Sequence, residues 1–344
     1  MHQLAIPDFT GKYLFELVFY NRFYTLGAGF FTSSTPQGLS EPYFFRTNSV
    51  LAEQLGLGSN LFSSARALQV CSGNLLIQGM QPLAQAYAGH QLGKFNPFLG
   101  DGRSVLLGGI ETAAGYLEWQ LKGTGKTAYA RHADGLMGLN EALHEYNMSE
   151  QLAALGVPTV KCLALSAGKN LVYRQGFQAA AILTRLTPSF IRFGHFELYY
   201  FERKYAELQQ LADFVIQHYY RDCLSTQKPY AAFFQAVVER TAQLIAQWQN
   251  VGFVHGMMNT DNQSILGISL DLGESAFNTE RKPDFVSSAA DEKGRYAFAE
   301  QPVVGLWNCN ILARALSPLI EAGDLRMALE RYEPSYLAAF KSPT

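Results

Sequence analysis

The spacing of hydrophobic positions changes between the two halves of the chain. In residues 116–122, apolar and polar side chains alternate, which predicts a strand with Lys122 on its polar face, where it can face a cleft. Further strands are predicted at residues 104–108, 171–174 and 180–185. In residues 205–220 and 230–249, apolar side chains recur three and four positions apart, which predicts amphipathic helices. The pattern therefore predicts an α+β protein in which strands precede helices.

Two helices are predicted within the strand-rich half. Residues 139–155 show helical spacing followed directly by Gly and Pro stop signals, and they carry Glu145. Residues 45–56 are predicted as a shorter, capped helix that ends at a glycine. The crossover from strands to helices falls near residue 185. The predicted regions are residues 1–185 and residues 186–344.

Composition narrows the class of protein. The chain has 344 residues, 48% of them hydrophobic and 13% aromatic, enough for a large core or two lobes around a cleft. A net charge of −2 gives no electrostatic basis for binding nucleic acid or an anionic membrane surface. No stretch approaches the roughly 20 apolar residues of a membrane span, and residues 1–7 lack the features of a secretory leader. Four scattered cysteines show no metal-binding or disulfide spacing, so a cytoplasmic protein with reduced thiols is predicted.

Residues 255–262, with the sequence HGMMNTDN, form the most informative motif. In kinase-like phosphotransferases a His opens the catalytic loop, and an Asn seven residues later holds a metal ion. His255 and Asn262 have this spacing, and Asp271 follows after a short hairpin predicted at residues 264–270. Asn262 and Asp271 would offer hard oxygen ligands, which suit Mg²⁺ or Mn²⁺.

The same motif departs from the kinase pattern at its catalytic acid. The Asp that usually follows the His by two residues, and accepts the proton of the substrate hydroxyl, is replaced by Met257. An acid returns only at Asp261, next to the predicted metal ligand. His255 is interpreted as a residue that organises the loop through hydrogen bonds. The motif predicts a kinase-like nucleotide site with rearranged chemistry.

A second set of residues matches the phosphate-binding part of such a site. Lys122 on the strand and Glu145 on the helix would form the ion pair that orients nucleotide phosphates; the alternative is two ordinary surface charges. Gly100, Gly102 and Arg103 lie in a glycine-rich turn whose backbone N–H groups can approach phosphate. The alternative interpretation of this turn is an ordinary hairpin corner.

Two arginines near the boundary complete the candidate site. The guanidinium groups of Arg185 and Arg192 suit bidentate contact with phosphate. Arg192 lies among apolar residues, where an unpaired charge would be costly, so it needs an anionic partner. A bound phosphate and a salt bridge to Glu197 or Asp213 fit the sequence equally well.

Element order and motifs together predict an α+β, bilobal fold of the protein-kinase type. The N-terminal lobe would be β-rich and carry the helix with Glu145, and the C-terminal lobe would be helical and carry the catalytic loop.

Separated motifs, in matching order, resemble the selenoprotein O (SelO/YdiU) family between about residues 40 and 320. They are residues 86–91 (AYAGHQ), 99–103 (LGDGR), 120–125 (QLKGTG), 188–194 (PSFIRFG), 255–267 (HGMMNTDNQSILG) and 294–298 (GRYAF) with 301–302 (QP). The resemblance implies a kinase-like (pseudokinase) fold that binds its nucleotide flipped, so that AMP passes from ATP to Ser, Thr or Tyr hydroxyls of protein substrates. A manganese-dependent transfer of UMP from UTP is also implied.

The resemblance implies a role for individual residues of this chain. Asp261 would be the proton acceptor, Asn262 and Asp271 the metal ligands, and Lys122 would pair with Glu145. The residues implied to line the nucleotide are Gly100, Gly102, Arg103, Asp134, Gly135, Arg185 and Arg192. A flipped nucleotide would explain Met257, because the base moves together with the phosphorus that is attacked.

The chain also departs from the family pattern. Leu136, Asn140 and His144 stand where arginines are usual, and Gly109 replaces a usual Glu. The sequence ends at Thr344, short of the family's C-terminal helical extension with its redox-active residue, so redox control through that extension is not expected. Two rival functions follow. A nucleotide-binding pseudoenzyme that acts as a scaffold would keep the site without turnover. A small-molecule kinase has the same His-to-Asn spacing, but Met257 argues against it.

Overall fold

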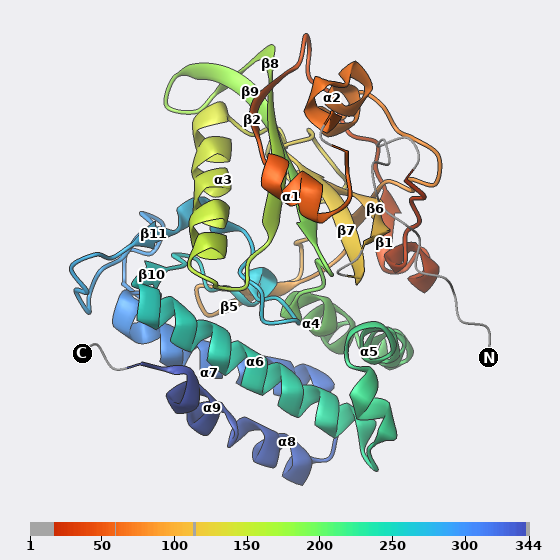
Figure 1. Ribbon diagram of the computed structural model, residues 1–344. Helices are drawn as coiled ribbons and strands as arrows, with labels where there is room; N and C mark the ends of the chain where they lie inside the picture. The colour runs from red at the N-terminus through yellow and green to blue at the C-terminus, as the bar shows by residue number, and fades with distance from the viewer. Residues whose placement is uncertain (1–16, 59, 113–114, 342–344) are drawn as a thin grey trace.

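The computed structural model describes residues 17–58, 60–112 and 115–341, and it confirms the α+β class (Figure 1). A sheet with a long helix beside it forms one layer, and the helices that follow residue 193 form a second layer against it. Residues 1–7, on which the prediction of no leader depends, lie outside the described residues. Within the described ranges, no helix is both long and apolar enough to cross a membrane.

An antiparallel sheet dominates the first layer. Within the described ranges it has seven strands in the order β1-β3-β6-β7-β9-β8-β2. The register sets Gln120 opposite Arg185, and because alternate residues of a strand share a face, Lys122 lies on the same face as both. The bounds are β1 Phe31–Ser33, β2 Tyr43–Thr47, β3 Leu83–Gln85, β6 Ser104–Thr112, β7 Gly115–Lys122, β8 Lys161–Tyr173 and β9 Phe177–Thr187.

The predicted strands are confirmed, but three of them are parts of longer ones: residues 104–108 begin β6, and the other two belong to one hairpin. Residues 171–174 and 180–185 belong largely to the hairpin of β8 and β9. Long stretches of both strands are buried on both faces, so their sequences lack the alternation that marks a half-buried strand. Small two-stranded pairs join β4 (Gly89–Gln91) to β5 (Lys94–Asn96), and β10 (Phe253–Val254) to β11 (Ala276–Phe277).

Helix α3 (Leu139–Ala154) lies beside β8 and β9, as predicted for the helix that carries Glu145. Its buried face includes Ala142, Tyr146 and Leu152, which pack against the sheet and the neighbouring core. Glu145 lies on the same face and is fully buried. Burial of a carboxylate here requires cationic partners from the sheet.

The helix predicted at residues 45–56 is corrected at its start. Residues 43–47 form strand β2, paired with β8, and the helix α1 covers only Ser49–Gln54. Asn48 explains the boundary, because its side chain accepts a hydrogen bond from the Leu51 N–H at 2.8 Å and so caps the helix. The stretch thus combines a strand and a helix, which one periodicity could not describe.

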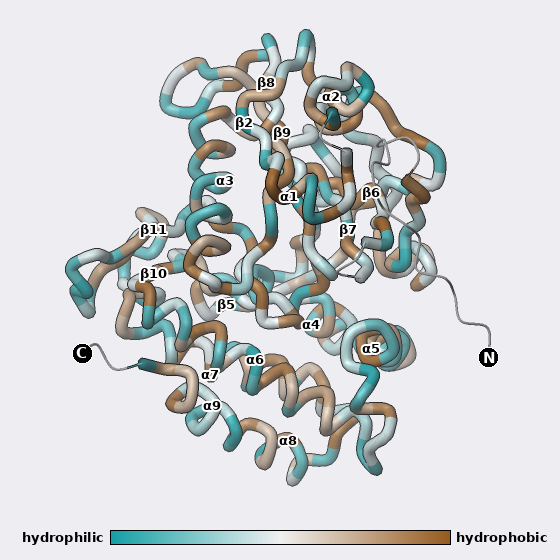
Figure 2. The backbone as a smooth tube through the Cα atoms, viewed as in Figure 1, coloured by the Kyte–Doolittle hydropathy of each residue, from teal (hydrophilic) through white to brown (hydrophobic). Residues whose placement is uncertain are grey.

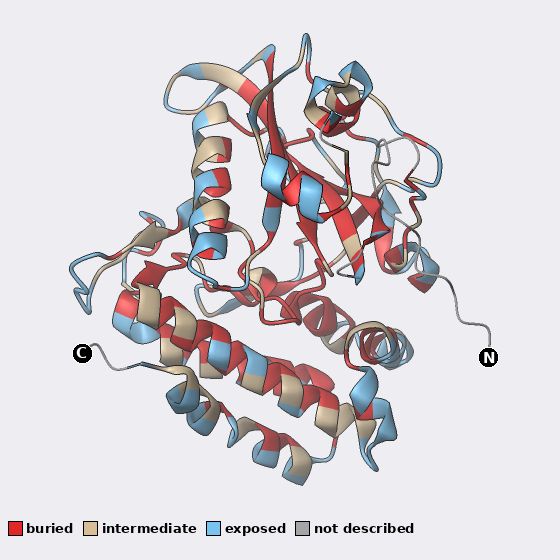
Figure 3. Ribbon diagram, in the orientation of Figure 1, coloured by how far each residue is buried: buried red, intermediate tan, exposed pale blue. Residues whose placement is uncertain are grey.

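The second layer is helical and encloses the larger core. Helix α6 packs against α7, α8 and α9, and Figures 2 and 3 show its mixed hydropathy and its buried positions. The two helices predicted at 205–220 and 230–249 are confirmed as α5 and α6. The bounds are α4 Phe193–Phe201, α5 Tyr205–Tyr219, α6 Pro229–Val251, α7 Gln301–Leu316, α8 Ala322–Leu329 and α9 Tyr332–Ala339; the remaining helix, α2, covers Ala65–Cys71 in the first layer.

The segment that follows α6 carries the predicted catalytic motif. Gly252 ends the helix with φ of 73°, a left-handed conformation that glycine adopts without strain. The predicted hairpin at residues 264–270 is only a turn, closed by an isolated bridge between Gln263 and Ser269. Asp271 follows with φ of 55°. Within this segment His255 Nδ1 accepts a hydrogen bond from the Met257 N–H at 3.4 Å, and Nε2 donates to the Leu270 carbonyl oxygen at 2.7 Å, which fits the organising role predicted for it.

Replacement of Asn48 by Ala tests the boundary of α1. The change removes the cap and the contact of the Asn48 amide with Glu150 at 2.9 Å. We expect a loss of about 1 kcal/mol in the free energy of unfolding and a fall in Tm of about 2 °C. Gln54→Ala, at an exposed position of the same helix, is the control. An equal Tm for both variants would contradict the capping role.

Candidate active site

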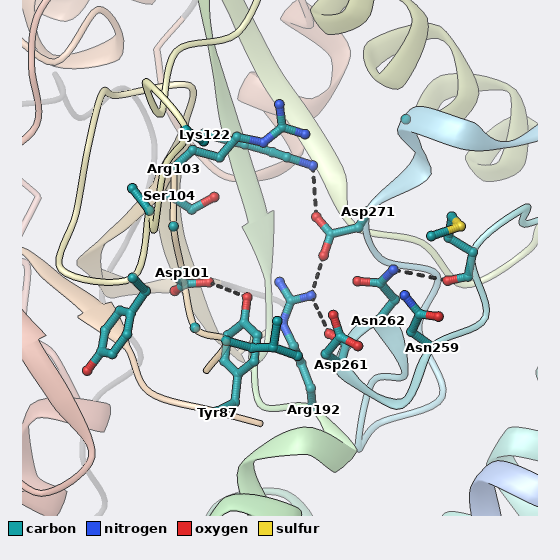
Figure 4. A pocket seen from close by; sticks show the side chains of 18 of the residues that line it. Tyr87, Asp101, Arg103, Ser104, Lys122, Arg192, Asn259, Asp261, Asn262 and Asp271 are labelled. Atoms are coloured by element: carbon teal, nitrogen blue, oxygen red, sulfur yellow. Dashed lines mark hydrogen bonds and ion pairs between the residues drawn. The ribbon is translucent and has the colours of Figure 1, made fainter. Parts of the chain in front are cut away.

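A cavity of about 360 Å³ lies where the sheet meets the catalytic segment (Figure 4). Its walls come from the glycine turn at 100–103, from the end of β7, from the start of α4 and from residues 257–262 with Asp271. Of the residues implied to bind nucleotide or metal, these line the cavity: Gly100, Gly102, Arg103, Lys122, Arg192, Asp261, Asn262 and Asp271.

An ion-pair network centred on Asp271 borders the cavity. Lys122 Nζ lies 2.6 Å from Glu145 Oε2 and 2.8 Å from Asp271 Oδ1, so the predicted pairing of Lys122 with Glu145 is present. Arg185 Nη1 is 2.9 Å from both Glu145 Oε1 and Asp271 Oδ1. Arg192 contacts the other oxygen of Asp271. Three cations therefore share two carboxylates, which leaves positive charge in excess.

The network fixes the charge state of its members. Burial alone would raise the pKa of Asp271, but Arg192, Lys122 and Arg185 together hold that pKa well below its usual range. Burial also opposes ionisation of Glu145, whose pKa is nevertheless lowered by Lys122 and Arg185. Both carboxylates are therefore charged at neutral pH, and each depends on the cations around it.

Of the two alternatives for Arg192, a bound phosphate and a salt bridge to Glu197 or Asp213, the structure contradicts the salt bridge to either residue. Glu197 instead contacts His90 at 2.5 Å, and Asp213 accepts a hydrogen bond from the Tyr230 hydroxyl. Arg192 lies directly before α4 and directs its guanidinium to Asp271 and to the Asp261 carbonyl oxygen, 2.7 Å away. The partner could not be found by sequence proximity because Asp271 is 79 residues away.

Arg185 and Glu145 lie behind the cavity, with fully buried side chains. They act on the cavity through Lys122 and Asp271, and they do not line it. Arg185 is held in place further by the Gln120 side chain, its register partner in the sheet.

Asp134 and Gly135 lie away from the cavity wall. Asp134 is half-exposed and forms an ion pair with Arg174, 2.5 Å apart. Gly135 has φ of 71° and packs so closely against Gly125 that a side chain would clash with backbone atoms. In this structure both residues shape the loop around Gly125, and neither borders the space beside Asp261.

The carboxylate of Asp261 is buried, and its two oxygens differ in their hydrogen-bond partners. Its Oδ2 accepts a hydrogen bond from Gln91 Nε2 at 3.0 Å, whereas its Oδ1 is buried without a hydrogen-bond partner among the described residues. Burial raises the pKa of Asp261 from 3.8 to about 7. A carboxylate with a free oxygen and a pKa near neutrality is suited to accept a proton.

Asn262 and Asp271 have the donor chemistry that Mg²⁺ or Mn²⁺ requires. The Asn262 amide donates through Nδ2 to the Met257 carbonyl oxygen at 3.0 Å, so its Oδ1 points toward Asp271 (Figure 4). Both offer hard oxygen atoms at the cavity wall. Among the described residues, no group of three or more His, Cys, Asp or Glu side chains is placed to hold a metal ion.

Sequence analysis did not assign roles to several residues of the site. Asp101, buried between the two glycines, accepts hydrogen bonds from the Tyr87 hydroxyl at 3.2 Å and from the Gln120 amide at 3.3 Å. Asn259 accepts from the Tyr296 hydroxyl at 2.6 Å. Asp101 and Tyr87 belong to motifs singled out in the sequence, but only the fold shows that they meet.

Comparison with known proteins identifies the family. Residues 13–343 match the family model described as protein adenylyltransferase SelO. The chain belongs to the SelO family.

Curated relatives in the SelO family carry the name protein nucleotidyltransferase YdiU. The protein from Azotobacter vinelandii is 43% identical over 331 residues, which is 96% of this chain and 68% of the relative. The protein from Klebsiella pneumoniae subsp. pneumoniae is 44% identical over 312 residues, 90% of this chain and 65% of the relative. This SelO-family chain thus spans about two thirds of the length of these relatives.

A solved structure titled "WaaP in complex with acyl carrier protein" is 12% identical and covers 68% of this chain and 86% of its own. Its TM-score of 0.25 is too low to support an inference about the fold.

Asp271→Asn tests the dependence of the fold on the ion-pair network. The amide keeps the size of the side chain but leaves Lys122, Arg185 and Arg192 around a single carboxylate, so we expect a loss of about 3 to 5 kcal/mol in the free energy of unfolding. Asp134→Asn, in the half-exposed pair with Arg174, is the control and should cost about 1 kcal/mol or less.

The pH dependence of this loss has a defined sign. Because the pKa of Asp271 is lowered in the folded state, its contribution is complete at neutral pH and is lost as the pH falls below the ordinary value of 3.8. Urea unfolding at pH 7 and at several values below pH 3.8 should show the difference between wild type and Asp271→Asn shrink. A difference that stays constant would exclude the charge of Asp271 as its cause.

Proposed function

We propose that this chain transfers AMP from ATP to the hydroxyl groups of Ser, Thr or Tyr residues on protein substrates. In this proposal the protein is built as a bilobal, kinase-like (pseudokinase) fold, with residues 1–185 and 186–344 as its lobes and the cavity between them. Support comes from the family model, whose description is that of a protein adenylyltransferase, and from the relatives named nucleotidyltransferases.

One observation carries the proposal: the cavity that contains Lys122 and Arg192 also contains Asp261, whose Oδ1 has no described hydrogen-bond partner. Met257 lines the same cavity and offers no proton-accepting group where ordinary kinases have their base. A nucleotide whose terminal phosphates lie at the cations would present its α-phosphate, and not its γ-phosphate, to a hydroxyl beside Asp261.

The proposed step conserves atoms and charge. The hydroxyl oxygen of the acceptor attacks the α-phosphorus while Asp261 accepts the hydroxyl proton. The bond between the α-phosphorus and the oxygen that bridges to the β-phosphate breaks, and pyrophosphate leaves with that oxygen. Lys122 and Arg192 neutralise the negative charge that develops on the leaving group.

Asn262 and Asp271 are proposed to hold Mg²⁺ or Mn²⁺, which would neutralise and orient the phosphates when bound. The residues of this chain supply the remaining steps: Lys122, Arg192 and the glycine turn bind phosphate, Arg185 and Glu145 keep Lys122 in place, and Asp261 takes the proton. Arg103 pairs with Glu141 at 2.7 Å and would exchange this partner for phosphate. Transfer of UMP from UTP would use the same groups, since the phosphates and the proton transfer are the same for both nucleotides.

ATP labelled separately at the α- and γ-phosphates tests the proposal. With Mg²⁺ or Mn²⁺ and a mixture of acceptor proteins, we expect α-label and no γ-label to become attached to protein, because the proposed base lies at Asp261 and not at position 257. Asp261→Ala should reduce the transfer to a small residual rate and keep ATP binding. Attachment of γ-label alone would establish a kinase, and tight ATP binding without any transfer would establish a pseudoenzyme scaffold. Repeating the assay with UTP compares the two nucleotides.

The pH profile tests the role of Asp261. Burial raises its pKa to about 7, and only the ionised carboxylate accepts a proton, so we expect the transfer rate to rise with pH and level off above about 7. Below that value the rate should fall about tenfold for each pH unit. ATP affinity measured across the same range is the control, because the guanidinium of Arg192 keeps its charge there. A rate that is flat between pH 5.5 and 8.5 would exclude Asp261 as the base.

A further inference from the structure

Strand β4 of the small β4–β5 hairpin lies directly against the catalytic segment. The His90 N–H donates to the Thr260 hydroxyl at 2.7 Å, and the Leu92 N–H donates to Asn259 Oδ1 at 3.1 Å. Gly89 approaches so closely that a Cβ there would lie 2.9 Å from the Cβ of Asp261. The segment from 89 to 92 thus forms one side of the immediate surroundings of Asp261, although about 170 residues separate them in sequence.

A chain of amide hydrogen bonds runs from this hairpin to Asp261. The Phe98 N–H donates to Asn96 Oδ1 at 3.0 Å, Asn96 Nδ2 donates to Gln91 Oε1 at 3.3 Å, and Gln91 Nε2 donates to Asp261 Oδ2 at 3.0 Å. A backbone N–H can only donate, so it fixes which end of the Asn96 amide faces Phe98. The orientation of Asn96 in turn fixes that of Gln91, whose amide group is directed at Asp261.

The hydrogen bond from Gln91 makes the two carboxylate oxygens of Asp261 different. Oδ2 is engaged by Gln91, while Oδ1 is buried without a described partner in the cavity wall. Rotation of a carboxylate about its terminal torsion meets only a low barrier, so a hydrogen bond to one oxygen decides where the other points. Gln91 itself lines the cavity beside Asp261.

We propose that Gln91 is a positioning residue for the transfer reaction: held by Asn96, it engages Oδ2 of Asp261 and leaves Oδ1 as the atom that accepts the hydroxyl proton. The inference rests on the proposed function, in which Asp261 is the base. It adds a specific atom to that role and makes the β4–β5 hairpin part of the active site. The arrangement corresponds to that of other catalytic bases, which are oriented by a third group.

Gln91→Met tests the proposal because it keeps the volume of the side chain and removes its donor. We expect kcat for α-label transfer to fall roughly tenfold to a hundredfold, while KM for ATP changes by less than about twofold because Gln91 contacts the base and not the phosphate-binding cations. Gln91→Glu presents a carboxylate to Asp261, so its kcat should fall at least as far. Gln235→Met, at an exposed position of α6, is the matched control. A Gln91→Met enzyme with wild-type kcat would overturn the proposal.

Substitutions at position 96 test the direction of the hydrogen bonds between Asn96, Gln91 and Asp261. A merely structural role of Asn96 would not depend on this direction. Asn96→Ala releases the Gln91 amide and should lower kcat modestly. Asn96→Asp can still accept from the Phe98 N–H, but its second oxygen also accepts, so the Gln91 amide should turn and present Oε1 to Asp261. We expect Asn96→Asp to lose more activity than Asn96→Ala. The opposite order would contradict the relay.

Two further measurements separate this inference from the proposed function. In an Asp261→Ala background, Gln91→Met should cause no additional loss of residual transfer. If Gln91→Met instead damaged the structure independently of Asp261, the losses of the two substitutions would multiply in the double variant. If wild-type protein transfers no label at all, the proposed function fails, and crystal structures still decide the positioning role. We expect Gln91 Nε2 within hydrogen-bond distance of Asp261 in wild type and a rotated Asp261 carboxylate in Gln91→Met. An unchanged carboxylate would overturn the inference.

Discussion

The carboxylate of Asp271 is the contact on which the arrangement of the site depends. Through its two oxygens it binds Lys122 at the end of β7, Arg185 in β9 and Arg192 before α4. These cations are buried, with side-chain exposures of 5% or less, so none of them could keep its position without a nearby anion. Glu145 supplies the second anion from α3. One network therefore ties the sheet, its helix and the catalytic segment together.

This network also gives the cavity its chemical character. Because three cations share two carboxylates, an additional anion at Lys122 and Arg192 would meet uncompensated positive charge. A polyphosphate is such an anion. Asp271 holds these cations in place before any ligand binds, which reduces the cost of ordering the site on binding.

The catalytic segment is positioned from both sides. On one side, the ring of buried His255 contacts the Leu270 carbonyl oxygen, and its backbone N–H donates to Gln301 Oε1, which anchors the segment to α7. Burial lowers the pKa of His255, so it acts here as a neutral hydrogen-bonding group. On the other side, the β4–β5 hairpin contacts Asn259, Thr260 and Asp261. Asp261 is thus held by parts of the chain that are distant in sequence.

The sequence alone determined the elements with a clear period and the motifs with a fixed spacing. Alternation placed Lys122 on the polar face of β7, helical spacing located α3, α5 and α6, and the interval from His255 to Asn262 located the catalytic segment, because each of these depends on residues close together in the chain. Prediction from residue spacing failed where the local pattern was mixed, as at β2 and α1. It also failed where two residues are paired by the tertiary structure. Only the fold decided that Arg192 binds Asp271 and that Arg185 lies behind the cavity. It also decided that Asp134 lies away from the cavity and that Gln91 reaches Asp261. The sequence encodes the charge or hydrogen-bonding capacity of a side chain, but its partner depends on which distant segments pack against it.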